Sequence, residues 1–137
     1  MTKLKSERAR TVARWALAAA YLAAGAMHLA LPGPFVDIVP GWVPLPELVV
    51  ALTGLAEIVG AVGLMLPRLR RAAGIGLALY AACVWPANFE HARQALAGGG
   101  LPPSLLYHVP RLALQPAIVW WALWAGAVLD WPFGRRA

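Results

Sequence analysis

The stretch LTGLAEIVGAVGLML, residues 52–66, carries one carboxylate, Glu57, in an almost wholly apolar run. With the residues before it, the run extends over 47–66, and about 20 mostly apolar residues are enough to cross a bilayer as a helix. An ionisable side chain inside such a helix is costly, so it normally faces the interior of the protein. The stretch therefore predicts a membrane-spanning helix with a buried carboxylate near its centre.

The composition extends this prediction to the whole chain. Of its 137 residues, 61% are hydrophobic and 13% are charged, whereas a soluble domain has about 25% charged residues. Three further apolar runs are long enough to span a membrane, at 11–31, 72–91 and 111–129. We therefore predict an all-α integral membrane four-helix bundle that forms a single domain over residues 1–137.

Charge and proline give the bundle an orientation. The segment 32–46 contains five prolines and several apolar side chains, so it predicts an outer loop that lies at the membrane interface. Ten of the 12 Lys and Arg residues fall on one side of the predicted membrane if both termini lie there, and only Arg93 and Arg111 fall on the other. The positive-inside rule then places both termini in the cytoplasm. No basic face with interleaved aromatic residues is present, and we expect no nucleic-acid partner.

Polar side chains follow one face of each predicted helix. Each of these faces also carries small residues, which let membrane helices approach closely. The candidate site residues on these faces are Tyr21 and His28, Glu57, Trp85 and Asn88, and Arg111 and Gln115. We expect Glu57 at the floor of a pocket that opens outward, paired with His28, Arg111, Asn88 or Gln115. Alternatively, these residues serve only as polar contacts that hold helices together.

Three other residue types bear on the site. His28, His91 and His108 all fall on the outer side, but no two of them have the i, i+4 spacing of a strong ligand pair, so we predict no metal site. The single cysteine, Cys83, lies in an apolar run and is predicted to be buried. Pro86 and Pro116 each remove a backbone hydrogen bond close to the expected pocket.

Four segments carry a family resemblance: AGAMHLALPGPFVDIVPGWVP (24–44), LTGLAEIVGAVGLMLPRLRR (52–71), WPANFEHA (85–92) and RLALQPAIVWWALW (111–124). In this order they resemble the DoxX-like family of small bacterial membrane proteins. The resemblance implies a four-helix bundle in the bacterial cytoplasmic (inner) membrane. It also implies that His28, Glu57, Asn88, Arg111 and Gln115 occupy the family's polar positions, and the family includes a subunit of a thiosulfate:quinone oxidoreductase.

Three functions are consistent with these residues. The first is a redox-linked membrane protein that binds a quinone-like or other small lipid-soluble ligand. Glu57 and His28 would then be the catalytic proton carriers, and Arg111, Asn88, Gln115, Tyr21 and Trp85 would bind the ligand. Its electrons would come from a soluble redox partner. The second is a non-catalytic binding or assembly protein, alone or as a homo-oligomer. The third is a proton-transfer isomerase or cyclase that acts on a lipid-soluble substrate.

Overall fold

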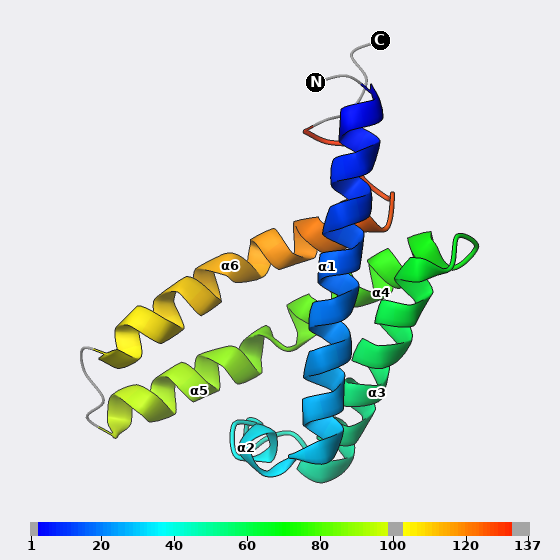
Figure 1. The fold of residues 1–137 in the computed structure, drawn as a ribbon. Helices are drawn as coiled ribbons and strands as arrows, with labels where there is room; N and C mark the ends of the chain where they lie inside the picture. Colours follow the sequence, from blue (N-terminus) through cyan, green and yellow to red (C-terminus); the bar gives the residue numbers. More distant parts are fainter. Residues whose placement is uncertain (1–2, 99–102, 133–137) are drawn as a thin grey trace.

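The computed structural model describes residues 3–98 and 103–132. All regular structure in these two ranges is helical (Figure 1). The helices are α1 (Lys3–Ala30), α2 (Gly33–Val36), α3 (Pro46–Met65), α4 (Arg70–Cys83), α5 (Trp85–Ala97) and α6 (Pro103–Ala125). Arg135 and Arg136, which the sequence analysis counts on the cytoplasmic side, lie outside the described residues.

Within the described residues, three stretches are long and apolar enough to cross a membrane: Leu4–Ala30, Pro46–Met65 and Arg70–Ala97. They cover the first three of the four predicted spans. The fourth predicted span corresponds to α6, which is not among the three and which has two prolines in its interior, Pro110 and Pro116, together with Arg111 and Gln115. The all-helical prediction is therefore confirmed, and the membrane-spanning property is supported for three of the four helices.

The stretch predicted as a helix over 72–91 is helical on both sides of one interruption. α4 ends at Cys83 and α5 begins at Trp85, with Val84 between them. Pro86 lies in the first turn of α5 and has no N–H to donate to the carbonyl of Ala82, so the helix is weakened at this point. Beyond the interruption α5 runs beside α6 and away from α1 and α3 (Figure 1).

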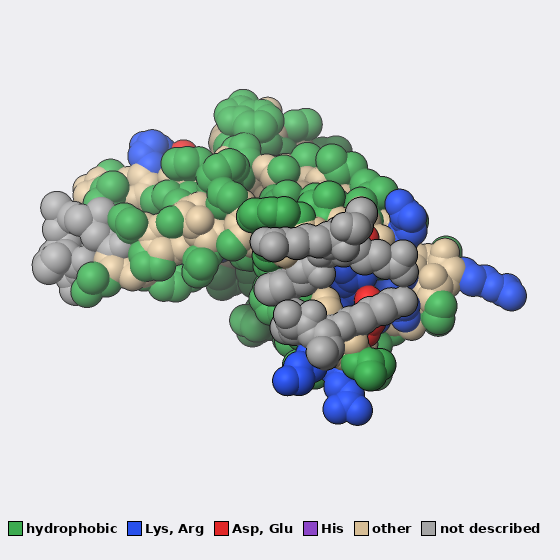
Figure 2. Space-filling model, turned by 90° about the horizontal axis from the view of Figure 1, so that it is seen from above, with side chains coloured by type: hydrophobic (Ala, Val, Ile, Leu, Met, Phe, Trp, Pro, Cys, Tyr) green, Lys and Arg blue, Asp and Glu red, His purple; other side chains and the backbone are tan. Residues whose placement is uncertain are grey.

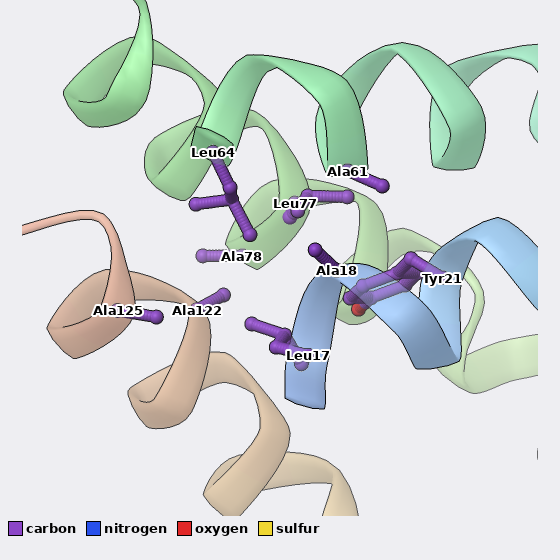
Figure 3. Packing of buried hydrophobic residues seen from close by; sticks show 9 residues of the cluster. All are labelled: Leu17, Ala18, Tyr21, Ala61, Leu64, Leu77, Ala78, Ala122 and Ala125. Atoms are coloured by element: carbon purple, nitrogen blue, oxygen red, sulfur yellow. The ribbon is translucent and has the colours of Figure 1, made fainter. Parts of the chain in front are cut away.

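The core lies where α1, α3, α4 and α6 meet, and it is built largely from small side chains. Figure 3 shows how they converge from the four helices. Its buried members are Leu17, Ala18, Tyr21, Ala61, Leu64, Leu77, Ala78, Ala122 and Ala125. Glycines bring the helices closer still: a Cβ at Gly25 would lie 2.6 Å from the carbonyl oxygen of Gly54 on α3. α1 and α3 therefore pack backbone against backbone.

The first half of α1 is held by the end of α6. Arg10 forms an ion pair with Asp130 at 2.6 Å, and Arg14 donates from Nε to the carbonyl of Ala125 at 2.8 Å. The indole of Trp121 donates to the carbonyl of Ala13 at 3.0 Å. Figure 2 looks onto this end of the molecule, where Lys and Arg side chains gather beside an extensive hydrophobic surface. Arg10 and Arg14 are thus more than flanking charges, since both are buried.

Replacing Arg14 with leucine is expected to lower the free energy of unfolding by about 1–2 kcal/mol. The change leaves the Ala125 carbonyl without its donor and keeps most of the side-chain bulk. Arg8→Leu is the matched control, because Arg8 lies on the same helix with an exposed side chain. Unfolding in detergent with increasing sodium dodecyl sulfate would measure both variants. Equal stability of the two would contradict a role for the Arg14–Ala125 contact.

Candidate functional site

A cavity of about 580 Å³ lies between the helices, and every helix from α1 to α6 contributes to its wall. Most of the wall is apolar, from residues such as Leu17, Val50 and Ile118. Its polar groups come from a few side chains, and six of the seven predicted site residues are among them. These are Tyr21, His28, Glu57, Asn88, Arg111 and Gln115. The polar side chains predicted on separate helices therefore line one common cavity, with the exception of Trp85.

Glu57 is only 4% exposed and is held by two other side chains. The hydroxyl of Tyr80 donates to its Oε1 at 2.7 Å, and Nδ1 of His28 lies 3.0 Å from its Oε2. The same Nδ1 donates to the carbonyl of Ala24 at 2.8 Å, so its proton is not aimed at Oε2. Oε2 is buried without an aligned hydrogen bond and keeps an acceptor position unused. We call Glu57, Tyr80 and His28 the carboxylate cluster.

Tyr80 is the functional candidate that the sequence analysis missed. It lies one residue before Ala81, off the face of α4 that was expected to turn inward, and it reaches Glu57 across the contact between α3 and α4. A phenol hydroxyl in an apolar run needs a hydrogen-bond partner when it is buried. This requirement is the feature of the sequence that could have indicated Tyr80. Tyr21 supports Tyr80 edge-on, with ring centroids 6.0 Å apart.

Two amides form a second polar group where α5 and α6 meet the end of α4. Asn88 donates from Nδ2 to Oε1 of Gln115 at 3.3 Å, and Gln115 donates from Nε2 to the carbonyl of Ala81. Both amides are less than 10% exposed. Ala81 lies within a turn of the interruption at Val84, so Gln115 supplies a donor where the helix ends. Neither amide forms a hydrogen bond with Glu57.

Arg111, one of the four alternatives considered as the partner of Glu57, contacts His91 and Tyr107 instead. Its Nη1 donates to Nδ1 of His91 at 2.9 Å, and its guanidinium lies 5.7 Å from the centre of the Tyr107 ring. His108 is buried against His91, with ring centroids 4.6 Å apart. Over residues 3–98 and 103–132, no three His, Cys, Asp or Glu side chains come together in a way that could hold a metal ion.

Trp85 and Cys83 do not lie where the sequence predicts. Trp85 is not among the residues that line the cavity, and its ring lies 5.8 Å from that of Phe89. The interruption at Val84 ends the regular spacing that would have continued the inward face of α4 as far as Trp85. Cys83 lines the cavity but is exposed, so the prediction of a buried thiol is wrong.

The proline-rich segment 32–46 covers one side of the cavity. Phe35, in the short helix α2, stacks on His28 with ring centroids 3.9 Å apart. Gln94 of α5 donates to the carbonyl of Asp37 at 3.2 Å and so ties this segment to α5. Trp42 also lines the cavity, although 76% of the residue is exposed. The segment thus joins the carboxylate cluster to the second half of α5.

Comparison with known proteins gives one family. Residues 17–126 match a family described as "Domain of unknown function (DUF8561)". The match begins at the first cavity-lining residue, Leu17, and extends beyond the last, Trp121. It leaves out Arg10, Arg14 and Asp130. No curated protein and no solved structure matches the chain.

Proposed function

The chain belongs to this family of unknown function (DUF8561), and we propose that it is a membrane protein whose cavity binds a small lipid-soluble molecule with a hydrogen-bonding head. The observation that carries the proposal is the carboxylate cluster in the wall of an otherwise apolar cavity of about 580 Å³. Sites for small molecules commonly have about 300–1,000 Å³ of mostly apolar space with a few placed polar groups.

A quinone-like head fits these groups. Its carbonyl oxygens accept hydrogen bonds, and its reduction takes up two electrons and two protons. In this protein Glu57 and His28 would hold and pass the protons, and Tyr80 would keep the carboxylate oriented through the bond to Oε1. The second hydrogen on the amide of Asn88 or Gln115 provides a further donor. The electrons would come from a soluble redox partner, so the protein would act as a subunit of a redox system.

The membrane placement is part of the proposal. Three stretches long and apolar enough to span support it, and the exposed surfaces of the helices carry large apolar side chains such as Leu22, Leu52 and Leu79. We propose four spanning helices in the bacterial cytoplasmic membrane, with both termini on the cytoplasmic side. The resemblance to the DoxX-like family remains a prediction that agrees with this arrangement.

Native mass spectrometry of the detergent-purified protein, with solvent extraction of what co-purifies, tests the proposal. The wild-type protein is expected to retain a lipid-soluble molecule, and Glu57→Gln is expected to lose about 90% of it, because the amide removes the charge beside His28 and places an NH₂ group where Oε2 keeps its unused acceptor position. Glu90→Gln is the matched control, since Glu90 binds Arg93 near the outer surface, outside the main cavity.

The outcomes separate the three functions. A bound quinone that Glu57→Gln loses supports the redox function. A ligand that the wild type and Glu57→Gln both bind, and that neither converts, supports a carrier or assembly role. Conversion without a redox partner supports an isomerase or cyclase. A wild-type protein that contains no ligand and also fails to bind an added short-chain quinone would contradict the proposal.

A further inference from the structure

Arg111 is a cation on the cavity wall with no anionic partner among the described residues. The chain has six acidic side chains, and all six are described. Glu7 and Asp130 pair with Arg10, Glu90 pairs with Arg93, and Glu57 pairs with His28. The remaining two, Asp37 and Glu47, form no ion pair with any described cation, Arg111 included.

The groups that do contact Arg111 cannot neutralise it. His91 accepts a hydrogen bond at Nδ1, so a neutral His91 carries its proton on Nε2 and is itself a donor. His108, packed against His91, is 5% exposed, and its Nδ1 makes no hydrogen bond with the described residues. The guanidinium has five N–H donors, and His91 takes up one of them. This side of the cavity therefore offers positive charge and free donors.

A metal ion does not suit these histidines. Binding a metal through Nε2 of His91 would move the ring proton to Nδ1, where it would point at the guanidinium of Arg111. The guanidinium would also repel the metal. An anion is favoured at the same place, because Arg binds carboxylate and other oxyanion groups through paired, charge-assisted hydrogen bonds.

We propose that the cavity takes a lipid-soluble organic acid, with its ionised carboxyl or acidic hydroxyl group bound by Arg111 and its apolar body against the cavity wall. The wall is shared by Arg111 and the carboxylate cluster, which lie on different helices, α6 on one side and α1, α3 and α4 on the other. Glu57 already interacts with His28 and Tyr80. Arg111 is therefore the charged group of the cavity wall that is available to bind a ligand. This inference rests on the proposed function, since it names the charge of a ligand in the same cavity.

The test compares an acid with its own ester. The probes are 11-bromoundecanoic acid and its methyl ester, whose bromine quenches tryptophan fluorescence, and both Trp42 and Trp121 line the cavity. At a pH where the acid is ionised, the wild-type protein is expected to bind the acid at least about tenfold more tightly than the ester. Arg111→Gln is expected to lose this preference and to bind the ester as before, which also shows that the variant is folded.

Two more variants sharpen the result. Arg93→Gln removes a cation on the neighbouring helix α5. Because Arg93 is exposed and paired with Glu90, the preference for the acid should persist in this variant. Arg111→Lys keeps the positive charge but lacks the planar guanidinium with its paired N–H donors, so it should retain part of the preference for the acid over the ester. Equal binding of acid and ester by the wild type, or equal loss in Arg93→Gln and Arg111→Gln, would overturn the inference.

The failure of this inference can be told from failure of the proposed function. A protein that binds the ester and a neutral short-chain quinone as well as the acid still has a ligand cavity, so only the inference about charge is wrong. A wild-type protein that binds none of the three probes overturns both.

Discussion

Replacing Gly74 with alanine is expected to destabilise the protein by about 1–3 kcal/mol. A Cβ at this position would lie 2.7 Å from Cα of Gly126 and 2.8 Å from the carbonyl oxygen of Ala122. Both atoms belong to the backbone at the end of α6, so the strain can be relieved only by moving α6 away from α4. Unfolding in detergent with increasing sodium dodecyl sulfate would measure the change.

The control for this prediction lies two residues further along α4. A Cβ at Gly76 would meet nothing within 4 Å, so Gly76→Ala should be neutral or stabilising by up to about 1 kcal/mol, as expected when alanine replaces glycine in a helix. If the two variants unfold alike, the close contact between α4 and α6 does not contribute to stability as the structure implies.

Replacing Glu57 with leucine is expected to cost about 3 kcal/mol. The change removes the acceptor of the part-buried Tyr80 hydroxyl and the carboxylate beside His28, while Nδ1 of His28 keeps its bond to the carbonyl of Ala24. Removing one member of a buried polar pair costs more than replacing both members by apolar groups. The double variant Glu57→Leu/Tyr80→Phe should therefore be more stable than Glu57→Leu alone.

The same unfolding measurement applies to the single and double variants, with Tyr80→Phe completing the cycle. Additive losses would mean that Tyr80 and Glu57 are not coupled, and would contradict the hydrogen bond at 2.7 Å. Recovery in the double variant would show that the two side chains are coupled, and a double variant more stable than the wild type would show that Glu57 is retained at a cost to stability. That result would fit a residue kept for binding or proton transfer.

The helices and the inward position of Glu57 could be predicted because they depend on local pattern. A 20-residue apolar run needs no knowledge of its neighbours to be recognised as a helix, and α3 spans Pro46–Met65 against a prediction of 47–66. The small residues around Glu57, such as Gly54, mark the face that packs on another helix, and Gly54 does lie against α1.

Other features depend on contacts between distant segments, and the sequence does not reveal these. Arg14 and Ala125 are 111 residues apart, and nothing in the basic start of the chain indicates that one of its arginines is buried. The break at Val84 was missed because proline is often tolerated inside membrane helices. Tyr80 was missed because its partner depends on how α3 and α4 are rotated against each other.

The contacts of Arg10 and Arg14 also have a consequence for the order of assembly during synthesis. Both arginines are made with the first helix, whereas their partners, Asp130 and the Ala125 carbonyl, follow all the other helices along the chain. Domains begin to fold while the chain is still being made, N-terminal part first. Until α6 emerges, Arg14 lacks the Ala125 carbonyl and Arg10 has only Glu7 on its own helix, so both guanidinium groups stay hydrated or bind lipid phosphates. Docking of α6 onto α1 is therefore a late step in biogenesis, and a ribosome-stalled chain that ends before Ala125 should still expose both arginines to water.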